Sequence, residues 1–139
     1  MKDRFRFRVW NNRDWDDEYG QAYYDAEKTY DYLQGKPRVP ASSFGDLLDD
    51  DQWIVEQCTG LKDKNGRLIY EGDIILKIDK NGLGLPRYRN CRVFWYEKWL
   101  AWAIETVYGD VYMLHEYDYT QYEVIGNIHE DPELLEGGV

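Results

Sequence analysis

Residues 57–76 read QCTGLKDKNGRLIYEGDIIL, and the pattern of this stretch is the main indication of the fold. Its polar centre ends in Asn65-Gly66, the pair that most readily takes the positive φ of a tight turn. Apolar residues stand on both sides of that turn. A second break at residues 71–73 then precedes the apolar run of residues 74–76. The stretch therefore predicts a β-hairpin followed by the start of a new strand.

Short apolar runs separated by glycine-containing turns continue this pattern through the C-terminal half. They predict strands at 53–59, 68–70, 74–78, 91–96, 99–107, 111–114 and 122–128, with a loop at 80–85. At the other end, residues 4–10 alternate arginine with apolar residues, which is the period of a strand with two different faces.

Two segments have helical signals. Residues 21–34 place Tyr23, Ala26, Tyr30 and Leu33 at helical spacing, and Gly35 is well placed to end that helix. Near the C-terminus, Pro132 and the acids beside it predict the start of a short helix.

These patterns predict a mainly β fold, α+β overall. We expect an antiparallel barrel or sandwich with a helical insertion between the first strands and a short C-terminal helix. We expect one domain over residues 1–139, in which residues 20–50 form a helical and proline-containing insertion and residues 53–135 form the β core.

Charge and composition limit the functional classes. The net charge is −10 although five of the first 13 residues are basic, and an acidic body repels nucleic acid and anionic membranes. No apolar run approaches the ~20 residues that span a membrane. The charged start without an apolar leader favours a reduced, cytoplasmic setting, in which Cys58 and Cys91 are expected to be buried thiols rather than a disulfide.

Several motifs together resemble the phage-associated YopX family. They are the opening RFRVW, then TGLKDKNG at 59–66, IYEGDI at 69–74, EVIGNI at 123–128 and DPELL at 131–135. The resemblance implies an SH3-like β-barrel encoded by a bacteriophage or prophage and acting in the bacterial host cytoplasm. It implies no reaction and no catalytic residues. Residues 11–52 depart from the family pattern.

The residues themselves do not assemble the signature of an enzyme. The chain has two histidines, His115 and His129, and neither stands at metal-ligand spacing from a second histidine or a cysteine. Both cysteines lie within apolar strand patterns, and the abundant acids single out no catalytic pair. We therefore expect no catalytic residues, no metal and no cofactor.

The favoured function is a protein-binding module whose partner is a host or phage protein. Tyrosine and tryptophan are enriched at the energetic centres of protein interfaces. The sequence has 13 tyrosines and six tryptophans. The candidate contact residues are Trp95, Trp99, Trp102, Tyr117 and Tyr119.

Two alternatives stay open. One is binding of single-stranded nucleic acid through Arg4, Arg6 and Arg8 on one face of the N-terminal strand, or through Arg87, Arg89 and Arg92 beside aromatic residues. The net charge disfavours it, and the N-terminal arginines can instead pair with carboxylates of the body. The other is self-association into a homo-oligomer through the N-terminal strand or the tyrosine-rich helix.

Overall fold

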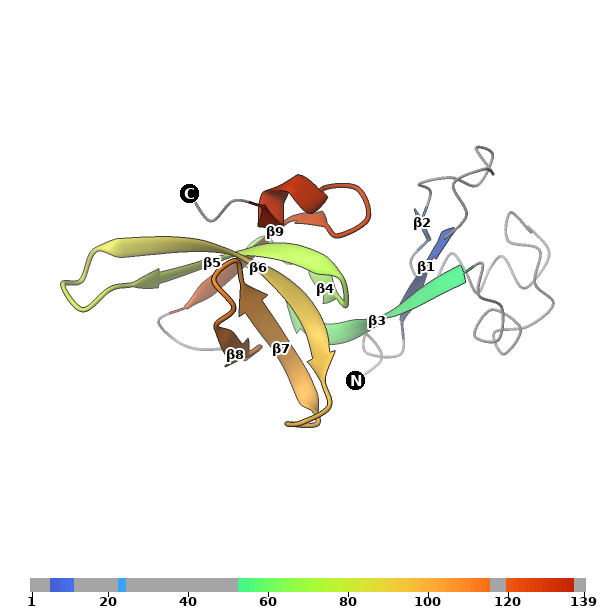
Figure 1. Ribbon diagram of the computed structural model, residues 1–139, viewed down its shortest axis with the longest axis horizontal. Helices are drawn as coiled ribbons and strands as arrows, with labels where there is room; N and C mark the ends of the chain where they lie inside the picture. The colour runs from blue at the N-terminus through green and yellow to red at the C-terminus, as the bar shows by residue number, and fades with distance from the viewer. Residues whose placement is uncertain (1–5, 12–22, 25–52, 116–119, 137–139) are drawn as a thin grey trace. The chain divides into compact units, whose positions relative to one another are not determined.

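The computed structural model describes residues 6–11, 23–24, 53–115 and 120–136 (Figure 1). The chain divides into two compact units, Met1–Cys58 and Thr59–Val139. All of the described regular structure is antiparallel β-sheet apart from one 3-10 turn. The strands form a four-stranded sheet in the order β2-β1-β3-β4 and a five-stranded sheet in the order β8-β7-β6-β5-β9.

In the first unit, the alternating N-terminal segment is a strand, as predicted. β1 (Phe7–Asn11) pairs with β2 (Tyr23–Tyr24) and with the first part of β3 (Trp53–Lys62). Arg8 lies directly opposite Glu56, and its Nε donates to the Glu56 carboxylate at 3.0 Å with both side chains buried. The prediction that the arginines of this strand meet carboxylates is thus confirmed for Arg8.

The prediction of a helical insertion is wrong at the two residues of it that the structure describes. Tyr23 and Tyr24, inside the helix expected at residues 21–34, form the short strand β2 opposite Trp10 and Val9. Aromatic residues suit a pleated strand, and the edge offered by β1 outweighs their helical spacing here. The rest of that helix, and the proline-containing segment after it, lie outside the described residues.

The second unit contains the predicted hairpin. The last residues of β3 lead into a turn at residues 63–67 and then into β4 (Leu68–Tyr70), and Gly66 takes a φ of 82°. The five-stranded sheet follows, built from β5 (Asp73–Lys80), β6 (Pro86–Tyr96), β7 (Ala101–Thr106), β8 (Val111–Met113) and β9 (Gln121–Asn127).

β5 and β6 extend together beyond their neighbours as a two-stranded ribbon. β9 pairs with β5 only as far as Ile78, and β7 pairs with β6 only from Cys91 onward. The remaining residues pair with each other as far as Lys80 and Pro86. Figure 1 shows this ribbon projecting from the sheet to the loop that joins the two strands.

Asp63 fixes the turn of the first hairpin and joins it to β9. One carboxylate oxygen accepts the N–H groups of Asn65 at 2.9 Å and Arg67 at 2.8 Å. The other accepts the N–H of Val124 in β9 at 2.9 Å. Next to it, the N–H of Lys64 donates to the carbonyl of Tyr122 at 2.8 Å. A buried carboxylate is stable here because backbone donors satisfy both of its oxygens.

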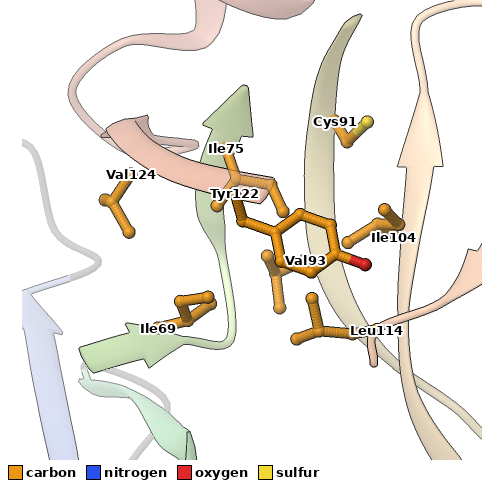
Figure 2. Close-up of a cluster of buried hydrophobic side chains, with 8 residues drawn as sticks. All are labelled: Ile69, Ile75, Cys91, Val93, Ile104, Leu114, Tyr122 and Val124. Carbon is orange, nitrogen blue, oxygen red and sulfur yellow. The ribbon is translucent and has the colours of Figure 1, made fainter. Parts of the chain in front are cut away.

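The core of this unit is formed by one apolar cluster to which the first hairpin and the five-stranded sheet contribute. Its members are Ile69, Ile75, Cys91, Val93, Ile104, Leu114, Tyr122 and Val124. Figure 2 shows the ring of Tyr122 in the middle of the cluster, among side chains from β5, β6 and β7. Leu61 and Trp102 pack against its border.

The expected SH3-like barrel is wrong, because the sheets do not close. In the described part of the chain, β8 and β9 remain the two edges of the five-stranded sheet. At the β9 edge, the side chain of Asp63 takes the N–H of Val124, so a carboxylate occupies the place of a neighbouring strand's carbonyl. That contact holds the hairpin against β9 without continuing the ladder.

The expected C-terminal helix is also wrong. Residues Pro132–Leu135 form one 3-10 turn with the bonds Leu134 N–H to Asp131 O and Glu136 N–H to Glu133 O. The side chain of Asp131 does not cap this turn, because its Oδ2 accepts the N–H of Asn127 at 3.2 Å. A Cβ on Gly126 would lie 2.5 Å from that oxygen and would have to displace the Asp131 side chain from this bond. Among the described residues, none belongs to a helix long and apolar enough to cross a membrane.

The role of Asp63 predicts a large effect of its removal. Asp63→Ala leaves the N–H groups of Asn65, Arg67 and Val124 without this acceptor, and we expect a loss of about 3 kcal/mol in the free energy of unfolding. Chemical denaturation with fluorescence detection measures it. The control Asp110→Ala removes an exposed carboxylate from another turn and should change stability by no more than about 0.5 kcal/mol. Equal stability of the two variants would contradict the role of Asp63.

Candidate functional site

The β6–β7 hairpin carries the tryptophans that the sequence singled out. Trp95 and Trp102 lie directly opposite each other, and their rings meet edge to face with centroids 5.2 Å apart. By the alternation of the strands, both are on the same side of the sheet as Val93 and Ile104 of the core. Trp102 packs against the core and Trp95 is 39% exposed, so this pair extends the core toward the hairpin end.

The opposite side of the same hairpin carries a continuous series of ring contacts. The guanidinium of Arg92 lies 4.6 Å from the centroid of the Phe94 ring. The Phe94 and Tyr96 centroids are 5.5 Å apart, and those of Tyr96 and Trp99 are 4.8 Å apart. Trp99 is 42% exposed. We call Phe94, Tyr96 and Trp99 the hairpin aromatic face.

Leu100 stands at the end of this face with an unfavourable backbone. It has a φ of 49°, and it is the only residue other than glycine with a positive φ in the described part of the chain. Its N–H donates to the carbonyl of Glu97 at 3.2 Å, which closes the turn. Its side chain is 72% exposed. A leucine in the left-handed region costs about 1–2 kcal/mol relative to the right-handed one, and burial does not compensate here.

The predicted protein-binding residues are thus only partly brought together. Trp95, Trp99 and Trp102 share one hairpin but divide between its two faces. Trp102 contributes mainly to the core, whereas Trp99 joins Tyr96 and Phe94 on the outer face. Tyr117 and Tyr119 lie outside the described residues.

The arginines predicted to contact nucleic acid are also divided. Arg4 lies outside the described residues, Arg6 is half-buried, and Arg8 is buried against Glu56. A phosphate could reach Arg8 only by displacing that carboxylate. Arg87 and Arg89 lie on the projecting part of β6, and Arg92 bonds Glu105 on β7 at 3.1 Å.

Arg87 belongs to a charge cluster at the base of the ribbon. Its guanidinium binds both oxygens of Asp79 on β5, at 2.9 and 3.1 Å. Lys77 reaches the same carboxylate at 3.1 Å and lies 3.9 Å from the centroid of the Tyr112 ring. The hydrogen bond from Arg87 holds the pKa of Asp79 below its usual value, against the opposing effect of burial, and Lys77 adds to the lowering.

Both thiols, those of Cys58 and Cys91, are inaccessible to solvent in the described structure. Burial raises the pKa of Cys91 to about 11, which keeps it protonated and a poor nucleophile at neutral pH. Among the residues that the structure describes, no group of three histidines, cysteines or acids is placed to hold a metal ion.

Sequence reasoning missed three exposed residues beside these sites. Leu100 carries no local signal, because its positive φ comes from closing the hairpin. Tyr88 and Tyr108 are 60% and 61% exposed and flank Arg89. The sequence shows that Tyr88 alternates with arginines. It does not show that β7 ends before this part of β6 and so leaves it exposed.

Comparison with known proteins identifies the family. Residues 6–136 match the family described as YopX protein. The chain belongs to the YopX family. A comparison with curated proteins gives no match.

Solved structures of low sequence identity resemble this YopX-family chain along its length. The crystal structure of protein yopX from Bacillus subtilis is 19% identical, with 96% of this chain and 99% of that chain covered and a TM-score of 0.51. The crystal structure of protein EF1440 from Enterococcus faecalis is 22% identical, with 94% and 97% covered and a TM-score of 0.45. The first likeness supports the fold and carries no assignment of function.

Four of the five motifs that carry the YopX resemblance lie in the second unit and have structural roles there. Asp63 and Gly66 form the hairpin turn, and Asp73 accepts the N–H of Tyr70 at 2.8 Å to shape the next turn. Gly126 and Asp131 close the C-terminal turn. These motifs maintain the fold, and the hairpin aromatic face lies outside them.

The lowered pKa of Asp79 predicts a pH-dependent contribution to stability. A carboxylate whose pKa is lower in the folded state stabilises the fold above its unfolded pKa of about 4, and this contribution is lost as the pH falls through the folded value. We therefore expect Asp79→Asn to lower the melting temperature most at neutral pH. The difference from the parent protein should shrink at acid pH. Thermal unfolding of both proteins over a pH series measures this, and a constant difference would contradict it.

Proposed function

We propose that the protein is a non-enzymatic binding module that docks on another protein through the hairpin aromatic face and Leu100. The observation that carries the proposal is the exposed leucine held at a positive φ beside exposed Trp99. Strained backbone and exposed apolar side chains both cost stability, and their coincidence favours a contact made by these side chains.

The shape of this surface suits docking. The ring contacts from Arg92 to Trp99 hold the aromatic side chains in fixed orientations, so little side-chain entropy remains to be lost on binding. Across the strands, Phe94 and Tyr96 face the small side chains Ala103 and Ala101. Trp99 and Leu100 then supply the exposed apolar ends that can enter pockets of a partner.

The partner we propose is a protein of the phage or of its bacterial host, met in the host cytoplasm, as the family resemblance implies. Absence of enzymatic activity is part of the proposal. It is supported by the burial and raised pKa of Cys91 and by the structural roles of the motif residues.

A first experiment tests whether Leu100 is retained for contact rather than for the fold. Leu100→Gly removes the penalty of the positive φ, and we expect the free energy of unfolding to rise by about 1 kcal/mol. Lys98→Gly, in the same turn without a positive φ, should instead lower it. Denaturant unfolding distinguishes the two. Loss of stability in Leu100→Gly would show that the side chain supports the fold.

A second experiment tests docking itself. The tagged protein is used to capture partners from a bacterial host lysate, and a captured protein is purified and titrated by calorimetry. Trp99→Ala combined with Leu100→Ala should weaken its binding by about thirtyfold, the effect of losing one strong contact residue.

The matched control is Leu83→Ala, at a side chain that is 85% exposed in the β5–β6 loop. It should leave the affinity unchanged. Equal affinity of the double variant and the control would overturn the proposal. If the double variant instead abolishes a dimer in sedimentation experiments without a partner, the face serves self-association and the proposed docking is wrong.

A further inference from the structure

A cavity of about 350 Å³ opens beside the projecting part of β6. It lies between that strand, the turn after β7 and the C-terminal 3-10 turn. Its lining residues are Arg87, Tyr88, Arg89, Asn90, Val107, Tyr108, Leu134 and Glu136. None of them belongs to the hairpin aromatic face, so this site is independent of the protein docking proposed above.

The cavity exists because β6 extends beyond the end of its neighbour β7. β7 begins to pair with β6 only at Cys91, and no described strand pairs with residues 86–90 on that side. Side chains from both faces of a strand reach its open edge, which is why successive residues from Arg87 to Asn90 line the cavity. The Nδ2 of Asn90 donates to the carbonyl of Leu134 at 2.9 Å and holds the 3-10 turn in place as the far wall.

The register of the ribbon also places backbone donors at the open edge of β6. The bond from Asn81 N–H to Leu85 O at 2.8 Å begins the ladder of the ribbon. Continuing that alternation along β6 directs the N–H groups of Tyr88 and Asn90 away from β5 and toward the open edge. The open edge of β6 therefore offers main-chain donors beside the side chains that line the cavity.

The two arginines of the lining differ in whether a carboxylate already pairs with the guanidinium. Arg87 is neutralised by its two bonds to Asp79. Among the described residues no carboxylate forms an ion pair with Arg89, whose guanidinium lies 5.6 Å from the centroid of the Tyr108 ring. Arg89 thus offers a positive charge and planar N–H donors to an anion entering the cavity.

We propose that this cavity binds a nucleoside monophosphate unit. Arg89 and the outward backbone N–H groups bind the phosphate, and the exposed ring of Tyr88 stacks with the base. The volume is in the range of small-molecule sites. Glu136 in the lining and the net charge of −10 disfavour polyphosphates, so a single phosphate fits best. The unit is either a free mononucleotide or one residue of a single strand.

The experiment titrates the full chain at low salt with a mononucleotide mixture, a thymidine oligonucleotide, inorganic phosphate and a hexaglutamate peptide. Calorimetry and chemical-shift mapping are the readouts. We expect saturable nucleotide binding with shifts at residues 87–90. Arg89→Gln and Tyr88→Leu should each weaken it by about tenfold, in line with the loss of a charged contact or of one stacked base.

Arg67→Gln is the matched control, because it makes the same charge change at an exposed position of the first hairpin turn. It should not alter the affinity. Thermal unfolding checks that each variant folds, and Arg89→Lys, which keeps the charge, should bind with intermediate affinity if Arg89→Gln does not fold.

The ligands distinguish the sources of the nucleotide. Binding of mononucleotides identifies a free nucleotide, and binding of the oligonucleotide alone identifies a single strand; both support the proposal if Arg89→Gln weakens them and Arg67→Gln does not. Equal loss in these two variants, tighter binding of hexaglutamate than of any nucleotide, binding of inorganic phosphate alone, or no binding at low salt would each overturn it.

Discussion

One buried carboxylate connects the parts of the second unit. Asp63 accepts N–H groups from its own turn and from β9, so the position of the first hairpin and the edge of the five-stranded sheet depend on the same side chain. Because Ile69 of that hairpin belongs to the core, this polar contact also sets how the apolar cluster is covered. A hydrophobic contact would leave the hairpin able to slide, whereas directed bonds to a charged acceptor fix one register.

The residues that identify the family and the residues proposed for function are different sets. The motif residues shape turns and satisfy buried backbone donors. The exposed residues of the β6–β7 hairpin and of the β6 edge meet no such requirement. Family membership therefore defines a scaffold, and the contact surfaces must be argued from this chain's own side chains.

The sequence predicted the individual strands better than it predicted whether the sheets close into a barrel. Alternation, Asn65-Gly66 and the apolar runs located the strands of the second unit, because these signals act between near neighbours. The barrel prediction was wrong because the contact made at the β9 edge depends on Asp63, which is 61 positions from its partner Val124 in the sequence. The short C-terminal helix failed for a similar reason, since Asp131 is engaged by Asn127 and not by the turn it precedes. The tryptophans were found as residues, but their division between two faces depends on the register of β6 with β7.

The length of β6 also bears on how the molecule opens. Cys91 and Arg92 pair with β5 on one side and with β7 on the other, whereas residues 86–90 pair with β5 alone and have only the 3-10 turn near their far edge. Amide hydrogens of Cys91 and Arg92, which lie between two strands, are expected to exchange with solvent through larger openings than those of residues 86–90, which exchange through local fraying. One strand thus combines a centre that is paired on both sides with an end that can adjust its backbone without disturbing the core.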